Sequence, residues 1–432
     1  MKENDLSAPW VAIQGTGGPL ARKGNARLSL RVPFPVSWRS RHAPRKDARL
    51  GPILLTHGKL VTPEGILEAD LLVVDGKISA IGKDLNPPPG SRTLDVRGNW
   101  VLPGFIDTHV HGGLDADTMQ ASPEAFATIS QHLARHGVTG WVPTLFACPA
   151  DALDRVLEAI GEAMRQEGPG ARILGAHLES SFIAPKFKGA QPPEALRPID
   201  DPALRDVIRK HAAIIRIVTL APELAGATAL IAELVALGIR VSIGHTDASY
   251  DQALAGAQAG ATRVTHLCNA MRPFHHREPG TVGAALVTDG LDAELIADLV
   301  HVHPAGIQIA YRCKGADRLM LVSDALMGTG LPPGIHVLEG REIVIGEDVA
   351  KLPDGTIAGS IITLDRALRN VVEAAGIPLA DASRMASLTP ARSLGYPDRG
   401  ALEVGMRADL AVLDAEFRCQ GTWIVGERVY AP

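Results

Sequence analysis

The sequence predicts an α/β fold, a (β/α)8 barrel with a small β-sandwich domain that both ends of the chain form together. Two observations predict it. Between residues 103 and 399, eight apolar runs typical of strands alternate with segments that are mostly helical and amphipathic. Shorter β-like runs occupy residues 52–102 and return in residues 400–430. A doubly wound open sheet is the competing architecture, and the number of strand candidates favours the barrel.

The small domain is predicted from short apolar runs that turns separate. The turns are Asp75-Gly76 and the proline-rich run Pro87–Gly90. Because runs of the same kind reappear near the C-terminus, we expect the two ends of the chain to pair. The expected strands are Ile53–Leu55, Leu71–Val74, Ile78–Ile81, Thr93–Val96, Leu410–Leu413 and Trp423–Gly426.

The barrel is predicted over residues 103–399 from strands followed by helical crossovers. The expected strands are Gly104–His111, Val138–Phe146, Arg172–Glu179, Ile214–Ala221, Gly238–His245, Arg263–Asn269, Ala293–His301 and Arg318–Asp324. Amphipathic helices are expected at Pro123–His136, Ala150–Arg165, Ala225–Leu237 and Ser249–Ala259. A β-rich insertion at residues 325–363 precedes one more helix, Leu364–Ala375.

Composition is that of an ordinary globular enzyme. The 432 residues are 46% hydrophobic and 21% charged, with a net charge of −5, which argues against broad nucleic-acid binding. No apolar run approaches the length of a membrane span, so we expect no membrane partner. The four cysteines are scattered without a CxxC pair, which suits a reducing cytoplasm and offers no thiolate metal site.

The first 50 residues differ from the rest. They hold ten Lys/Arg and three Asp/Glu, a charge of +7, which leaves −12 for residues 51–432. They lack the apolar core of a signal peptide and show no sustained periodicity. A transit-like or nucleic-acid-binding arm is one interpretation; we favour a disordered extension outside the fold and assign it no function.

Polar side chains of a particular kind stand where the predicted barrel strands end. Because strand residues i and i+2 share a face, His109 and His111 point the same way. Parallel barrel strands bring their C-terminal ends to one rim, where reactive groups gather. The residues at these ends are His109, His111, Glu179, His245, His266 and Asp324. A single buried histidine is more often a satisfied core residue, but this coincidence over five strands favours a metal site.

These residue types allow a specific chemistry. Glu179, His245 and His266 supply three N/O ligands and leave a coordination position for water, as in catalytic metal sites. His109 and His111 could hold a second ion, with Glu179 as a bridge. Asp324 is placed to take a proton from water and return it to a leaving nitrogen. The expected cofactor is one or two divalent ions, zinc first, with iron, manganese or cobalt as alternatives.

Several stretches make the chain resemble the amidohydrolase superfamily and, within it, the N-acetylglucosamine-6-phosphate deacetylase family. The resemblance covers about residues 52–428, and the most family-specific stretch is Asn269-Ala270-Met271. The other supporting stretches are Pro103–Gly112, Gly175–Glu179, Lys188–Ala190, Gly244–Thr246, Thr265–Cys268, Ala297–Pro304, Leu321–Ala325 and Ala358–Ser360.

The resemblance implies roles for individual residues. Glu179, His245 and His266 match the family's principal metal ligands, and Asp324 matches its general base and acid. Substrate-contacting positions are matched by Ala190, Gln191, Asn269, Ala270, Arg277, Asp298, His301, Ile357, Ala358 and Gly359. The implied substrate is a phosphorylated N-acetylated amino sugar, whose phosphate would suit Arg277 and His301. In the family these groups can come from a neighbouring subunit, which implies a homodimer.

Two departures from the family pattern bear on the substrate. Ser180-Ser181 stands where the family has Gly-Pro after the glutamate ligand, and Gln191 stands where it has a histidine that donates near the substrate carbonyl. An amide can donate a hydrogen bond but cannot carry a proton. The alternatives are therefore N-acetylgalactosamine 6-phosphate, another amide, or, more remotely, a non-catalytic scaffold.

Overall fold

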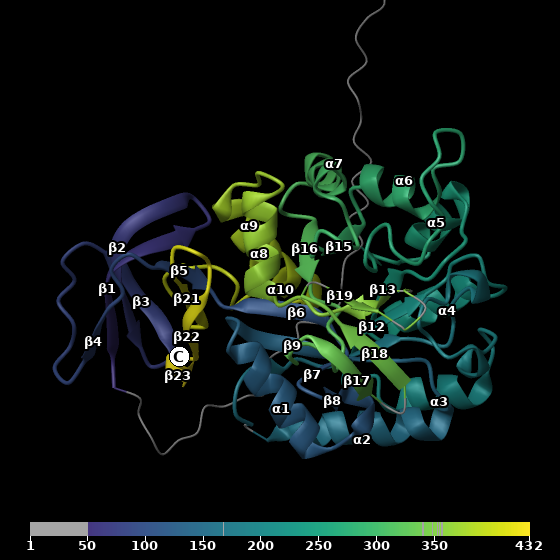
Figure 1. Ribbon diagram of the computed structural model, residues 1–432, viewed down its shortest axis with the longest axis horizontal. Coiled ribbons are helices and arrows are strands. Elements are labelled where there is room, and N and C mark those ends of the chain that lie inside the picture. Colours follow the sequence, from purple (N-terminus) through teal and green to yellow (C-terminus); the bar gives the residue numbers. More distant parts are fainter. Residues whose placement is uncertain are drawn as a thin grey trace, which may run out of the picture. The chain divides into compact units, whose positions relative to one another are not determined.

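The computed structural model describes residues 51–166, 168–338, 341–347, 349–351, 353, 355 and 357–432 (Figure 1). The predicted extension at residues 1–50 lies outside the described residues, and its character stays a prediction. Within the described part of the chain, no helix combines the length and the apolar character that crossing a bilayer requires.

Eight parallel strands form the predicted barrel, and the competing open sheet is wrong. Hydrogen-bonded pairs run in sequence order, and the final strand is tied back to the first by an Asp324 amide that donates to the carbonyl of His109 at 2.9 Å and by a parallel bridge between Val110 and Ala325. The barrel strands are β6 (Phe105–Val110), β9 (Val138–Leu145), β11 (Ala176–Glu179) with its short forerunner β10 (Arg172–Ile173), β12 (Ile215–Leu220), β13 (Arg240–Ile243), β14 (Arg263–Val264), β15 (Asp292–Ile296) and β16 (Leu319–Val322).

Several strands end earlier than the sequence predicts. The expected run to Asn269 stops at Val264, because His266 (φ 27°) and Cys268 (φ 77°) take left-handed backbone conformations that turn the chain. The expected run to His301 stops at Ile296, since the Asp298 carboxylate accepts the amides of the next turn. His266 and Asp298 thus sit in the turns that follow their strands.

Helices alternate with these strands, as predicted (Figure 1). Side chains cap some of their starts: Ser122 accepts from the Ala125 amide, and Ser249 forms a capping box with Gln252. The helices are α1 (Pro123–Ala134), α2 (Ala150–Arg165), α3 (Pro202–Lys210), α4 (Ala227–Ala236), α5 (Tyr250–Gln258), α6 (Gly280–Val287), α7 (Pro304–Lys314), α8 (Leu364–Glu373), α9 (Leu379–Ala386) and α10 (Leu388–Leu394), with 3-10 turns η1 (Thr118–Gln120), η2 (Pro185–Phe187) and η3 (Pro193–Ala195).

The two ends of the chain form a second sheet, also as predicted. Its strands are β1 (Ile53–Thr62), β2 (Gly65–Val74), β3 (Lys77–Gly82), β4 (Arg92–Asp95), β5 (Trp100–Pro103), β21 (Leu410–Leu413), β22 (Cys419–Ile424) and β23 (Glu427–Tyr430). The ends meet where β5 pairs antiparallel with β21, and Leu102 opposes Ala411 (Figure 1). Leu60, Leu71 and Trp423 belong to a core that this sheet encloses. The exact domain limits stay a prediction.

The insertion after β16 is β-rich, as expected. It contains the antiparallel strands β17 (Gly334–Leu338), β18 (Arg341–Ile345), β19 (Val349–Lys351) and β20 (Ile357–Ser360). A smaller hairpin, β7 (Gly112–Gly113) with β8 (Ala116–Asp117), follows β6. A parallel bridge joins Ser360 to Ala325, so the end of β20 lies beside the turn that carries Asp324.

Candidate metal centre

Glu179, His245 and His266 meet at the C-terminal ends of their strands. The Glu179 Oε1 atom lies 2.9 Å from Nε2 of His245 and 3.0 Å from Nε2 of His266, and the two imidazole nitrogens are 3.1 Å apart. All three side chains are buried. The structure thus gathers one carboxylate oxygen and two imidazole nitrogens at a single point.

A second group of the same kind lies beside the first. Nε2 atoms of His109 and His111 are 3.2 Å apart, and each is 3.2 Å from Oδ1 of Asp324. Glu179 touches this group too, through Oε1 at 3.4 Å from His109 and Oε2 at 3.5 Å from His111. The carboxylate of Glu179 therefore lies between two sets of potential ligands.

The donor set fits divalent cations. Ligand atoms bound to one ion at about 2.0–2.1 Å, with angles of about 90–115°, are roughly 2.9–3.5 Å from one another. The separations within both groups fall in this range, and each group satisfies the mixed imidazole and carboxylate chemistry of zinc, iron, manganese or cobalt. Three ligands a group leave room for water or substrate.

The electrostatics of the site also favour cations. Burial opposes charge on Glu179 and Asp324, yet the neighbouring histidines hold the pKa of both carboxyls below the ordinary range. Burial likewise opposes charge on His109, and the carboxylates of Asp324 and Glu179 raise its pKa well above the usual value. The anionic groups thus draw positive charge into a buried site.

The backbone presents these ligands in strained turns. His245, His266 and Asp324 have φ values of 48°, 27° and 49°, which non-glycine residues rarely adopt. Such conformations cost about 1–3 kcal/mol each and are concentrated at functional sites. Here they turn the side chains inward directly after β13, β14 and β16.

Carbonyl oxygens orient two of the imidazoles. Nδ1 of His245 lies 2.8 Å from the carbonyl oxygen of Phe187, and Nδ1 of His266 lies 3.1 Å from that of Asn269. A carbonyl accepts only, so each Nδ1 carries the proton and each Nε2 offers its lone pair to the centre.

Gln191 lies at the candidate metal centre itself. Its Nε2 donates to Oε2 of Glu179 at 2.6 Å, and its Oε1 accepts from the amide of Ala147 at 2.8 Å. The side chain is 1% exposed. Both polar ends of the amide are therefore engaged within the protein, and the donation to a substrate carbonyl that the resemblance implies stays a prediction.

The other expected substrate residues lie at different distances from the ligands. Ala270 follows the turn that orients His266, and its carbonyl accepts from the Thr246 amide. His301 pairs with Asp298 at 2.5 Å, and its pKa is raised, against burial, by Asp298 and in part by Asp324. Ala190 is exposed, on the loop that runs over His245, and Ile357, Ala358 and Gly359 belong to β20. Arg277 is exposed in a loop, where its guanidinium contacts His276.

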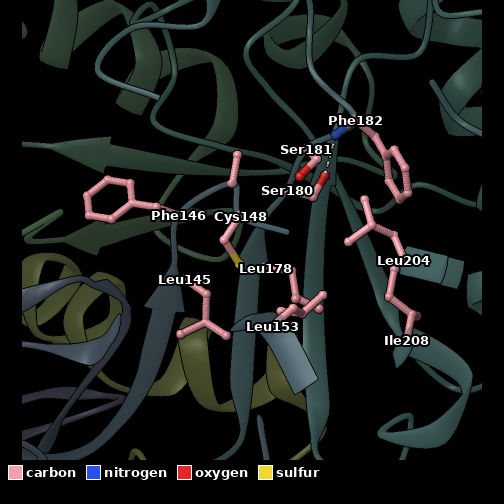
Figure 2. A pocket seen from close by; sticks show the side chains of 11 residues that line it. Leu145, Phe146, Cys148, Leu153, Leu178, Ser180, Ser181, Phe182, Leu204 and Ile208 are labelled. Atoms are coloured by element: carbon pink, nitrogen blue, oxygen red, sulfur yellow. Dashed lines mark hydrogen bonds between the residues drawn. The ribbon is translucent and has the colours of Figure 1, made fainter. Parts of the chain in front are cut away.

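The altered loop after Glu179 is held by hydrogen bonds of the Ser180 side chain. The Ser180 hydroxyl donates to the carbonyl of Thr219 at 2.5 Å. It also accepts from the Phe182 amide at 3.2 Å, as Figure 2 shows. This serine therefore closes the turn by hydrogen bonding.

A largely apolar hollow adjoins this loop on the helix side of the strands. Its lining includes Leu145, Leu178, Leu153 and Leu204 (Figure 2). Because adjacent strand residues face opposite ways, Leu178 points to the helices while Glu179 points into the barrel. The hollow is thus separate from the ligand cluster.

Two charged residues that the sequence analysis missed lie behind the cluster. Arg263 and Glu294 are fully buried, and Nη2 of Arg263 donates to Oε1 of Glu294 at 2.7 Å. Oε2 of Glu294 is 3.0 Å from Nδ1 of His109. The available signal was a charged residue beside aliphatic ones in each of two strands: Arg263 opens β14, and Glu294 is the middle residue of β15. His177 is also buried, and it is satisfied between the hydroxyls of Thr144 and Thr219.

Comparisons with known proteins identify the family of the chain. Residues 100–429 match the model of the amidohydrolase family. The chain is similar to an N-acetylgalactosamine-6-phosphate deacetylase of Escherichia coli O157:H7, with 39% identity over 85% of this chain and 97% of that protein. It is also similar to an N-acetylglucosamine-6-phosphate deacetylase of Lysinibacillus sphaericus, with 37% identity over 80% of this chain and 89% of that protein.

A solved structure shares the fold. It is a mutant N-acetyl-D-glucosamine-6-phosphate deacetylase from Mycobacterium smegmatis in complex with N-acetyl-D-glucosamine 6-phosphate. It superposes with a TM-score of 0.82 at 34% identity, over 88% of this chain and all of that one.

Proposed function

The chain belongs to the amidohydrolase family, and from this premise we propose that it removes acetate from N-acetylglucosamine 6-phosphate to give glucosamine 6-phosphate. The observation that carries the proposal is the pair of ligand groups that share Glu179, with Asp324 in one of them. An ordinary core would not gather four imidazoles and two carboxylates at one point, because burying unpaired charge is costly.

Glu179, His245 and His266 would hold one ion, and His109, His111 and Asp324 a second that Glu179 bridges. A bound divalent ion supplies Lewis acidity, which polarises the amide carbonyl and lowers the pKa of water. Zinc is the first candidate, and iron, manganese and cobalt fit the same ligands.

Asp324 moves the proton. Its Oδ1 lies 3.2 Å from Nε2 of both His109 and His111, so the carboxylate is held at the ligand cluster. The carboxylate takes a proton from the attacking water as the new C–O bond forms, and it gives that proton to the nitrogen as the C–N bond breaks. Water thus supplies the hydroxyl group to the carbon and, through Asp324, one proton to the nitrogen. The carboxylic acid formed then loses its proton, which completes the ammonium group, so the products are acetate and a protonated amine, and atoms and charge balance.

The sugar phosphate is the part of the substrate that the surrounding residues would recognise. A guanidinium offers paired donors to phosphate oxygens, which suits Arg277. His301 is near enough to Asp324 for the charge of that carboxylate to act on it. Because Arg277 is exposed in a loop, it could serve the site of a second copy. We therefore propose a homodimer, and, since all four cysteines are free, a cytoplasmic protein.

N-acetylgalactosamine 6-phosphate is the second candidate substrate. The similarity to a deacetylase of that name, together with Gln191 and Ser180 at the altered positions, favours it. The two sugars differ at one hydroxyl, so parallel kcat/KM measurements on both phosphates separate the candidates.

Acetate release from each phosphorylated sugar tests the proposal, with Asp324→Asn as the key variant. We expect a loss of about 10²- to 10⁴-fold in kcat, which is the usual contribution of general acid–base catalysis. Chelation should abolish activity, and metal should restore it. Activity of Asp324→Asn equal to wild type would remove Asp324 from its role. Activity that survives both Arg277→Ala and loss of the phosphate would indicate another amide substrate.

The scaffold alternative has a separate test. Elemental analysis of the purified protein should find bound metal, since all six ligand residues converge in the structure. A protein that takes up no metal after supplementation would instead support a non-catalytic scaffold.

A further inference from the structure

Arg263 and Glu294 form a fully buried ion pair directly behind one of the metal ligands. Both residues and His109 are 0% exposed. The Arg263 guanidinium donates to Glu294 at 2.7 Å and to the hydroxyl of Thr108 at 2.9 Å, and it also reaches the hydroxyl of Ser393. The other oxygen of Glu294 lies 3.0 Å from Nδ1 of His109.

A buried ion pair is poor evidence for a purely stabilising role. Desolvation of two charges commonly costs as much as their attraction returns, and apolar residues of similar size often do as well. The positive guanidinium of Arg263 lies 2.7 Å from one oxygen of Glu294, and the other oxygen faces Nδ1 of His109 at 3.0 Å. The pair therefore delivers a fixed anionic acceptor to His109 inside the barrel.

We propose that Glu294, held by Arg263, is the positioning residue that fixes His109 for the second ion of the centre. The inference rests on the proposed metal-dependent function. A carboxylate accepts only, so Nδ1 of His109 must carry its proton, and Nε2 then presents a lone pair toward His111 and Asp324. A carboxylate acceptor also makes the imidazole a more basic ligand than a carbonyl does.

The effect should be selective within the centre. His245 and His266 take their orientation from the carbonyls of Phe187 and Asn269, so their Nδ1 protons do not depend on Glu294. The Glu294 carboxylate contacts the His266 amide at 3.4 Å, and the backbone carbonyl of Glu294, which a side-chain substitution keeps, accepts from the Leu267 amide at 2.8 Å. Loss of the carboxylate should thus weaken the ion at His109, His111 and Asp324 and spare the ion at Glu179, His245 and His266.

Cobalt(II) titration of the full-length protein tests the proposal, followed by its visible spectrum and by chelator competition. We expect wild type to bind two equivalents, and Glu294→Gln to bind the second about 10- to 100-fold more weakly, as is typical when the partner of a metal-bound histidine is removed. Glutamine can donate to Nδ1 and so permits the wrong tautomer.

Two further variants keep the test sharp. Glu294→Gln leaves Arg263 as an unpaired buried charge, so the double variant Arg263→Met with Glu294→Gln removes the carboxylate without that penalty and should show the same selective loss. Asp409→Asn is the matched control, because Asp409 is a buried carboxylate that pairs with Arg407 at 3.0 Å in the small sheet. It should lower thermal stability and keep both ions.

Equal cobalt affinities in Glu294→Gln and wild type would overturn the role of Glu294. A second outcome would also overturn it. In that outcome both Glu294 variants lose both ions in proportion to their loss of thermal stability, and Asp409→Asn loses ions in the same proportion to its own loss of thermal stability. A wild-type protein that binds no cobalt contradicts the metal-dependent function itself, which separates the two failures.

Discussion

Replacing Gln191 by leucine should destabilise the protein and weaken metal binding together. The side chain is 1% exposed, and its amide joins Oε2 of Glu179 at 2.6 Å to the amide of Ala147 at 2.8 Å. Leucine fills similar space but makes neither hydrogen bond. The variant therefore separates the polar role of Gln191 from its packing.

The magnitude follows from the two contacts. A hydrogen bond to a charged group is worth about 1.5–3 kcal/mol, and a buried donor left without a partner costs about 1–3 kcal/mol. The Ala147 amide becomes such a donor, so we expect the free energy of unfolding to fall by roughly 2.5–6 kcal/mol. Because Glu179 loses a partner that fixes its orientation, we expect metal affinity to fall by about 10- to 100-fold.

Urea denaturation of the metal-free protein and chelator competition on the loaded protein measure these two effects. Gln308→Leu is the matched control, since its half-buried amide donates only to the neutral carbonyl of Ala375, at 3.1 Å. Its cost should stay near 0.5–1.5 kcal/mol, with metal affinity unchanged. If Gln191→Leu costs no more than this control and raises only KM, then Gln191 acts on the substrate and the reasoning fails.

Two remaining predictions concern stability away from the metal centre. Lys314 is buried where it donates to the carbonyl of Thr288, and burial lowers its pKa to about 8. Between about pH 8 and 10.5 the unfolded chain therefore binds more protons than the folded one. The free energy of unfolding should rise with pH across that window, by at most about 3 kcal/mol. Lys314→Met should flatten this rise in pH-dependent urea melts, and an unchanged slope would contradict the burial argument. A side chain at Gly104 would place its Cβ 2.2 Å from the Thr139 side chain, so Gly104→Ala should cost about 1–3 kcal/mol in thermal or urea unfolding. Thr139→Ser should recover part of that cost, and no recovery would show that the strain lies elsewhere.

Much of the fold followed from local patterns. The spacing of apolar residues along the chain shows which face of a strand or helix is buried, and that spacing differs between strands and helices. The barrel strands, the helices between them and the pairing of the two chain ends were predicted on that basis. The strand ends near His266 and Asp298 were placed too late, because the pattern does not reveal left-handed turns or the hydrogen bonds of a side chain to the next amides.

The candidate site was predictable to the extent that it lies on strand ends. His109 and His111 share a face by alternation alone, and the other ligands follow apolar runs at equivalent positions. Their roles as ligands, and that of Asp324 as base and acid, stay predictions that the converging geometry supports.

By itself the sequence determined which elements form and which polar side chains reach the rim of the barrel, because both depend on neighbours within a few residues. Only the tertiary structure decided the partners of those side chains. Gln191 returns from the loop after β11 to bind Glu179, and Glu294 on β15 contacts His109 on β6. Such contacts depend on how loops fold back and how strands align across the barrel. Both are determined jointly by residues that are far apart in the chain.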